Sequence, residues 1–140
     1  MLVFYAGFEG WQCQLLPALC IVGYFEVELA GKAKSLEDEG HDVAAIFSNN
    51  FHVRHRRVYE KEREKLVLVK GSGKSRLLGR AHQISSDGKN KEGQRLHILS
   101  EEMKQHFGSF TKINSIQRSN PRWVSEEFCE RAAVYVRQLD

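Results

Sequence analysis

Apolar residues gather most densely between residues 18 and 30. The segment Ala18–Val22 is continuously apolar, which is typical of a strand covered on both faces. Farther along, apolar and polar positions alternate, the period of a half-buried strand; the apolar members are Phe25, Val27 and Leu29. The pattern predicts one long central strand. A membrane span needs ~20 apolar residues, so this stretch is too short to be one.

Shorter apolar runs predict the other strands. They lie at residues 2–5, 66–69 and 96–99, while residues 76–85 fit a helix or a strand equally well. Pro17 precedes the central strand, at a position where a strand tolerates proline. Ser86–Gly93 is so polar that the sequence predicts an exposed loop there.

Capping residues and glycines mark the helices. The sequence predicts a helix over Lys32–Glu39 that ends at Gly40, and a short turn over residues 43–47 capped by Asp42. It also predicts a helix over residues 101–106 that is capped by Ser100 and stopped at Gly108, and a final helix capped by Ser125. One face of that final helix carries Phe128, Ala132, Tyr135, Val136 and Leu139, and Cys129 beside it is predicted to be a small core residue.

The elements together predict an α+β fold. We expect a single domain over residues 1–140, with helices flanking a mixed, mostly antiparallel sheet that is open or curled into a partial barrel. With 41% hydrophobic and 28% charged residues, the composition is that of a globular protein. The three cysteines are an odd number, and the chain shows no secretory signal, which together favour a reducing, cytoplasmic location. The oligomeric state stays open.

Several familiar chemistries lack their motifs. Residues 70–75 read Lys-Gly-Ser-Gly-Lys-Ser, but a phosphate loop needs glycine where Leu68 stands, so a glycine-bearing turn is favoured over a nucleotide triphosphatase site. The sequence has no C-x-x-C or H-E-x-x-H for zinc and no G-x-S-x-G for a serine hydrolase. We therefore predict no metal and no cofactor.

Groups of cations are the strongest chemical signal in the sequence. The net charge of +3 permits a polyanionic partner without requiring one. They gather in three predicted loops: His52, Arg54, His55, Arg56 and Arg57; then Lys70, Lys74 and Arg76; then Arg118 and Arg122 beside Trp123. Such groups attract phosphate, and Tyr5, Trp11 and Trp123 are candidates for stacking on a base. The alternative is that the cations are scattered and solvated, with Trp11 and Trp123 in small satellite cores.

Histidine offers a possible reaction. His52 or His55 can act as a general acid or base near neutral pH. The alternative is that both belong to an exposed basic segment without catalytic function.

Short motifs along the chain resemble a known family. They are Val3–Glu9 with Trp11, Gly23–Val27, Asn50-x-His52-x-x-x-Arg56, Lys70-Gly71 with Ser75–Leu78, and Arg118-Ser119-x-Pro121-Arg122-Trp123. Together they resemble the nucleotide-modification-associated domain of the third type, found in archaea and bacteria. Tyr24–Val27 also resembles a barrel strand of PUA-like and ASCH-like base-binding domains, by analogy alone.

The resemblance implies a link to systems that modify DNA bases or handle modified nucleotides, and it leaves open whether the protein is catalytic. Members of the family extend farther upstream, so the chain is expected to be a whole domain or the C-terminal part of a longer one. The polar positions that match the family pattern are Tyr5, Glu9, Asn50, His52, Arg56, Lys70, Ser75, Arg76, Arg118 and Arg122.

From these residues we expect recognition or processing of a nucleotide or nucleic acid. The binding residues are expected to be Asn50, Arg56, Lys70, Ser75, Arg76, Arg118 and Arg122, of which Asn50 reads a base or sugar edge. Tyr5 or Trp11 would stack on the base, and His52 with Glu9 would transfer protons in any reaction. The alternatives are an enzyme acting on free mononucleotides and a non-catalytic structural or interaction domain. No membrane partner is expected.

Overall fold

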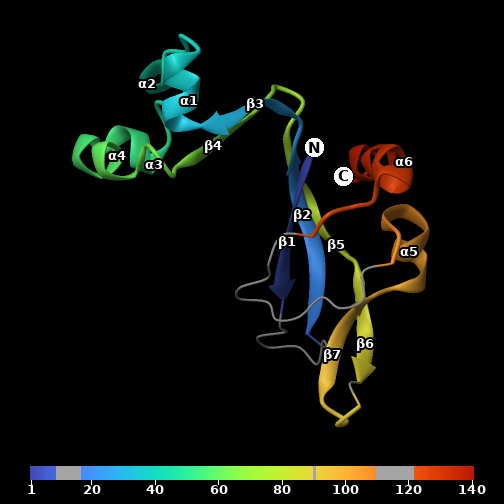
Figure 1. The fold of residues 1–140 in the computed structure, drawn as a ribbon. Helices are drawn as coiled ribbons and strands as arrows, with labels where there is room; N and C mark the ends of the chain where they lie inside the picture. The colour runs from blue at the N-terminus through green and yellow to red at the C-terminus, as the bar shows by residue number, and fades with distance from the viewer. Residues whose placement is uncertain (9–16, 90, 110–121) are drawn as a thin grey trace. The chain divides into compact units, whose positions relative to one another are not determined.

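The computed structural model of the protein describes residues 1–8, 17–89, 91–109 and 122–140 (Figure 1). The strands are β1 (Leu2–Phe8), β2 (Ala18–Phe25), β3 (Val27–Lys32), β4 (Val67–Gly71), β5 (Arg76–Gln83), β6 (Ser85–Lys89) and β7 (Arg95–Leu99). The helices are α1 (Ala33–Asp38), α2 (Val43–Ile46), α3 (Phe51–Arg54), α4 (Arg56–Glu62), α5 (Glu101–Phe107) and α6 (Glu126–Arg137). The α+β class is therefore confirmed. None of the helices in these ranges is long and apolar enough to cross a membrane.

The described strands form three small sheets instead of the single sheet that the sequence suggests. One has the order β1-β2-β5, and β3-β4 and β6-β7 are two-stranded ribbons. The pairings β2–β5, β3–β4 and β6–β7 are all antiparallel, and the described strands close no barrel.

The chain divides into two compact units, which are described separately. The ribbon unit consists of Met1–Leu2 and Phe25–Ser75 and contains β3, β4 and α1–α4. The sheet unit consists of Val3–Tyr24 and Arg76–Asp140 and contains the remaining elements.

The predicted central strand is broken at Glu26, which separates β2 from β3. Here the backbone bonds change partner: the Glu26 N–H donates to Ser75 Oγ at 3.1 Å, and the Glu26 carbonyl accepts from the Ser72 N–H at 2.7 Å. β2 pairs with β5, whereas β3 pairs with β4. The uninterrupted strand was thus wrong, because the partner strand changes at this point and apolar composition carries no information about partners.

The ribbon unit has its own small core. Helices α1–α4 gather at the end of the β3–β4 ribbon where Lys32 pairs with Val67 (Figure 1). The buried side chains are Ala33, Leu36, Val43, Phe47 and Leu68, with Leu29, Ile46, Val53, Tyr59 and Leu66 packed against them. Of the predicted buried strand at residues 66–69, Leu68 is buried but Val67 is 61% exposed. Only one face of this two-stranded ribbon is covered by the core, so alternate side chains along each strand remain exposed.

Exposed side chains at the end of β2 and the start of β3 overturn part of the predicted pattern. Phe25 and Val27 are exposed, whereas Leu29 is partly buried against the ribbon unit's core. The helices of this unit follow Lys32, at the far end of β3 from Val27. The alternation of apolar and polar residues therefore indicated a strand correctly but overestimated how much of it is covered.

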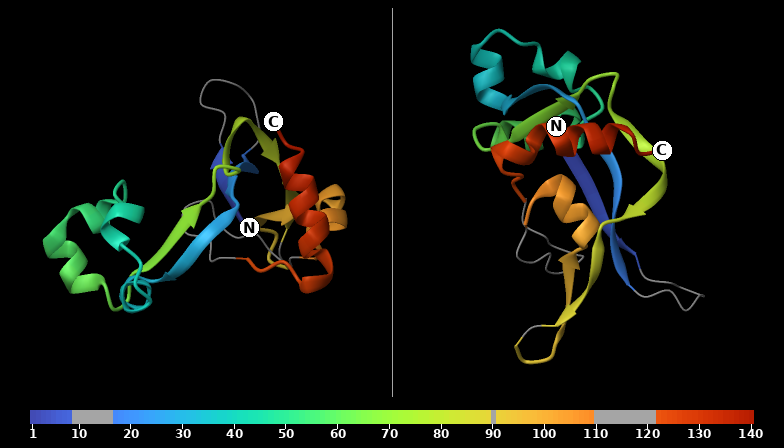
Figure 2. Two further views of the ribbon diagram at one scale, coloured as in Figure 1. Left: turned by 90° about the horizontal axis from the view of Figure 1, so that it is seen from above. Right: turned by 90° about the vertical axis from the view of Figure 1, so that its right-hand side faces the viewer.

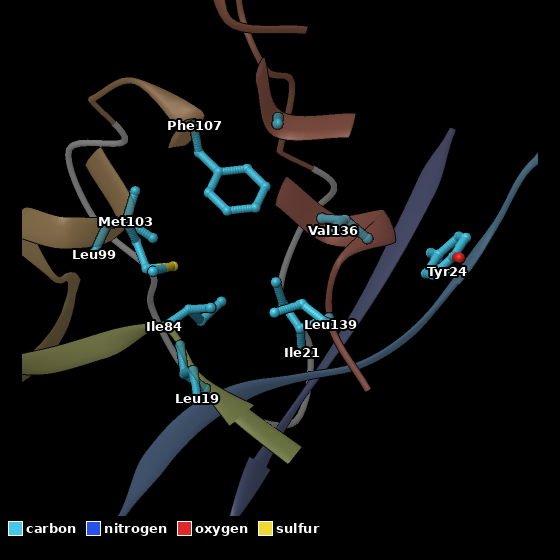
Figure 3. Close-up of a cluster of buried hydrophobic side chains, with 10 residues drawn as sticks. Leu19, Ile21, Tyr24, Ile84, Leu99, Met103, Phe107, Val136 and Leu139 are labelled. Carbon is cyan, nitrogen blue, oxygen red and sulfur yellow. The ribbon is translucent and has the colours of Figure 1, made fainter. Parts of the chain in front are cut away.

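The sheet unit is held by a larger core. Figure 3 shows Leu19 and Ile21 of β2 facing Met103 and Phe107 of α5, with Val136 and Leu139 completing the cluster. Two further views show α5 and α6 on the same side of the strands (Figure 2). Their interface includes Phe107 edge-on to Tyr135, with ring centroids 5.8 Å apart. The predicted apolar face of α6 is confirmed, since Ala132, Val136 and Leu139 are all buried.

Two local predictions in the sheet unit are wrong. Residues 86–89 of the predicted loop belong to β6, which pairs Ser86 with Ile98 and Gly88 with Leu96. Cross-strand contacts stabilise this polar strand, including a two-pronged bond from Arg95 to Asp87 at 2.9 Å. Cys129 is exposed instead of buried, because no described element covers this part of the first turns of α6.

The capping signals were largely correct. Asp42 and Ser100 accept hydrogen bonds from the backbone N–H groups of Ala45 and Met103, at 3.0 and 3.3 Å. Gly40 and Gly108 follow helices in the left-handed region, with φ of 86° and 75°. Ser125 precedes α6 as predicted, but its side chain makes no capping hydrogen bond to that helix.

Candidate functional site

The basic segment at residues 52–57 lies on two short helices that meet at His55. Asn50 begins α3: its Oδ1 accepts hydrogen bonds from the N–H groups of His52 and Val53, at 2.9 and 3.4 Å. His55 follows α3 and precedes α4 with φ −96° and ψ 86°, a backbone conformation that is not helical. Two helices form here because the chain bends at His55.

Packing of these helices determines which side chains reach solvent. Val53 and Tyr59 pack against the ribbon unit's core, so the other positions on α3 turn outward. Phe51 is 62% exposed, although it is a large aromatic residue. Arg54 lies one helical turn after Phe51, and such positions are neighbours on a helix surface.

We call the exposed residues Phe51, Arg54, His55 and Arg57 the α3 patch. The Phe51 and His55 rings touch, with centroids 4.3 Å apart and planes inclined by 48°. The side chains of Arg54 and Arg57 form no ion pair or hydrogen bond within the described part of the chain. The segment from residue 43 to 59 contains no Asp or Glu. The patch therefore combines an exposed aromatic ring with two uncompensated guanidinium groups.

Arg56, a predicted phosphate ligand, is engaged locally. Its Nε donates to Glu60 Oε1 at 2.8 Å, one turn along α4. The hydrogen bond that Arg56 donates to Glu60 raises the pKa of Arg56, so the guanidinium remains charged. Both side chains are exposed, so water screens their attraction and the pair contributes little to stability. A phosphate can displace Glu60 at that small cost.

His52, the predicted proton-transfer residue, is paired with a carboxylate that the sequence did not indicate. Its Nδ1 lies 2.8 Å from Glu62 Oε2, and both side chains are about half exposed. Glu9, its predicted partner, lies outside the described residues. Glu62 is ten positions away across the bend at His55, so helical periodicity could not identify it.

Asn50 has a structural role in addition to its predicted one. Its side-chain oxygen caps α3. While the cap is intact, only the amide N–H groups of Asn50 are left to form hydrogen bonds with a nucleotide.

The glycine-bearing turn after β4 is closed on itself. The Ser75 N–H donates to the Ser72 carbonyl at 3.0 Å, and the Lys74 N–H donates to Ser72 Oγ at 3.2 Å. The Ser72 N–H is bonded to Glu26. These N–H groups cannot also surround a phosphate, which agrees with the expected turn.

Two predicted binding residues lie at this turn. The Ser75 hydroxyl accepts the Glu26 N–H, and the Lys70 ammonium lies 3.2 Å from Glu28 Oε1. Lys70 is three residues along β4 from Val67, about 10 Å from the helical end of the ribbon at the usual strand rise. Lys70 is thus directed to Glu28 and lies away from the α3 patch.

The remaining predicted cations belong to the sheet unit or lie outside the described residues. Arg76 and Arg122 are exposed, and neither side chain has a partner among the described residues. Trp123 beside Arg122 is 87% exposed. Arg118 lies outside the described ranges. The predicted phosphate ligands are therefore divided between two separately described units.

Of the two residues expected to stack on the base, Tyr5 and Trp11, only Tyr5 lies within the described ranges. Tyr5 is half-buried and packs against the sheet unit's core, and its hydroxyl is buried without a hydrogen-bond partner in the described ranges. Trp11 lies outside those ranges. Phe51 is the exposed aromatic that sequence reasoning missed. Its signal was an aromatic residue directly after a helix-capping asparagine in an otherwise polar stretch.

Metal chemistry has no candidate among the described residues, where no group of three or more His, Cys, Asp or Glu is placed to hold an ion.

No protein-family model, curated protein or solved structure matches this chain. The family resemblance stated from the sequence therefore remains a prediction.

Proposed function

We propose that this protein binds a nucleotide or nucleic acid through the α3 patch. The observation that carries the proposal is the exposed Phe51 ring on α3, which also carries Arg54, followed by Arg57 on α4. Neither arginine has a carboxylate partner among the described residues. Arginine is suited to phosphate because its planar fork donates several hydrogen bonds, and an aromatic face accepts a base. Residues 43–59 contain no Asp or Glu, and the nearby carboxylates Glu60 and Glu62 pair with Arg56 and His52 instead of with the patch arginines.

Two further parts of the proposal rest on the sequence. The family resemblance supports a modified DNA base as the recognised or processed group. The unpaired thiols Cys20 and Cys129 support a cytoplasmic location, since reducing compartments keep thiols free.

The direct test is fluorescence anisotropy of a labelled oligonucleotide with the full chain, at several salt concentrations. Arg54→Ala with Arg57→Ala is expected to weaken binding at least 10-fold. The slope of log K against log salt should become shallower by about 1.4, since each phosphate contact to a single strand contributes about 0.7.

Lys89→Ala is the matched control, because Lys89 is an exposed cation of the sheet unit without a partner in the described residues. It is expected to change binding less than twofold. Absence of binding by the unmodified protein at low salt would overturn the proposed function. An equal loss in Lys89→Ala would show that net charge, not the patch, drives binding.

A second candidate is an enzyme acting on free mononucleotides. It is favoured by the His52–Glu62 contact at 2.8 Å, since a carboxylate that holds Nδ1 leaves Nε2 to exchange protons with a substrate. This candidate predicts mononucleotide turnover that His52→Ala abolishes without loss of binding. If neither oligonucleotides nor mononucleotides bind, a non-catalytic interaction domain remains.

A further inference from the structure

The orientation of Phe51 limits what the α3 patch can bind. Two imidazoles contact the ring: His55 at a centroid distance of 4.3 Å, and His52 edge-on at 5.7 Å. The rest of the ring remains in solvent, since the side chain is 62% exposed. The contacts restrict the ring before any ligand arrives, so less side-chain entropy is lost on binding.

Such a ring is suited to an unpaired base. A nucleobase that stacks on an aromatic side chain must expose one of its own faces. Bases inside a duplex have both faces covered by their neighbours, whereas bases of a single strand can unstack. His55 already occupies part of the Phe51 surface, so the patch offers one stacking position and not a slot between two rings.

The arginines supply the positive charge that a nucleic-acid ligand of the patch requires. Arg54 is one helical turn from Phe51, and Arg57 is two residues beyond His55. They can contact phosphates that flank the stacked base, while Phe51 distinguishes a strand with accessible bases from a duplex of equal charge.

We infer that the α3 patch takes an unpaired base of a single-stranded nucleic acid on Phe51, with His55 as a positioning residue. This inference rests on the proposed function and names its substrate class. Phe51 does not belong to the ribbon unit's core, so core packing does not explain an aromatic residue at this polar site. Stacking on a base gives the ring a role.

The test compares three labelled ligands with the same number of phosphates: a single strand, a duplex, and a strand containing abasic sites. Phe51→Leu keeps apolar bulk but removes the π face. It is expected to weaken single-strand binding 5- to 150-fold, the equivalent of about 1–3 kcal/mol per stacked base. Duplex binding and the salt slope should remain unchanged, because no phosphate contact is lost.

Abasic substitution should weaken binding by the unmodified protein as much as Phe51→Leu does. Combining the two changes should cost no more than either alone, since both remove the same stacking contact. His55→Ala should produce a smaller loss in the same direction. Val67→Ala, which alters a side chain of the same unit with similar exposure, should have no effect on binding.

Different results would overturn single-strand recognition by Phe51 alone or nucleic-acid binding as a whole. If Phe51→Leu binds single strands normally while the double arginine variant does not, the inference is overturned and the proposed function stands. Duplex binding equal to or tighter than single-strand binding also overturns it. Failure of the unmodified, folded protein to bind any of the ligands overturns both.

Discussion

Tyr59 Oη donates a hydrogen bond to Glu37 Oε1 at 2.8 Å and so joins α4 to α1 within the ribbon unit. Arg63 approaches the other oxygen of the same carboxylate at 3.5 Å. Burial and the bond to Glu37 raise the pKa of Tyr59 to about 12. The helices that carry the α3 patch are thus held by a polar contact that depends on the tyrosine proton.

This contact should fail in strong alkali. The folded-state pKa lies above the ordinary tyrosine value of about 10. The stabilising contribution is therefore complete below pH 10 and is lost as the pH rises through 12. Absorbance titration of the phenolates should reveal one tyrosine that ionises near pH 12, and Tyr59→Phe should remove it. Persistence of that step in Tyr59→Phe would assign it to another tyrosine.

The His52–Glu62 pair should contribute little to stability. Its side chains are 43% and 49% exposed, and exposed pairs typically contribute ~0–1 kcal/mol. A double-mutant cycle with His52→Ala and Glu62→Gln, measured by denaturant unfolding, should give a coupling energy below about 1 kcal/mol that falls with added salt. A larger, salt-insensitive coupling would contradict this expectation.

Gly23 allows β2 and β5 to approach closely. A Cβ at this position would lie 2.7 Å from the Arg76 carbonyl oxygen and 3.3 Å from Leu77 Cα. Both atoms are backbone, so they cannot move aside without shifting the strand. Gly23→Ala should lower the free energy of unfolding by about 1–3 kcal/mol.

Gly79→Ala is the control for Gly23→Ala on the opposite strand. Among the described residues, no atom outside Gly79 and its two chain neighbours lies within 4 Å of a Cβ at this position. Alanine there should therefore be neutral or stabilising by up to about 1 kcal/mol. Equal effects of the two substitutions in thermal unfolding would show that the close approach at Gly23 does not control stability.

The two cores should respond separately to substitution. Leu68 belongs to the ribbon unit's core and Leu99 to that of the sheet unit, and both are almost fully buried. Replacing either with alanine should cost about 2–5 kcal/mol. Hydrogen exchange should show the larger loss of protection within the unit that carries the change.

Leu77→Ala serves as the surface control for these core changes. Leu77 is 87% exposed, so its loss should change stability by less than about 0.5 kcal/mol. Loss of protection spread evenly over both units after Leu68→Ala would mean that the chain unfolds as one cooperative body.

The sequence by itself determined the local features of this protein. Asp42 and Ser100 indicated helix starts, and Gly40 and Gly108 indicated helix ends, because capping depends on residues within one turn. Apolar periodicity likewise predicted β1, β7 and the buried face of α6. These signals were sufficient for the α+β class.

Only the tertiary structure decided which distant groups meet. The break at Glu26 depends on Ser72 and Ser75, and the strand β6 depends on its pairing with β7. At the candidate site the sequence supplied the basic segment, but the fold paired His52 with Glu62 and left Phe51 in solvent. Composition records which side chains are available. Their partners and exposure depend on backbone pairing and packing between residues far apart in the chain, which no local pattern contains.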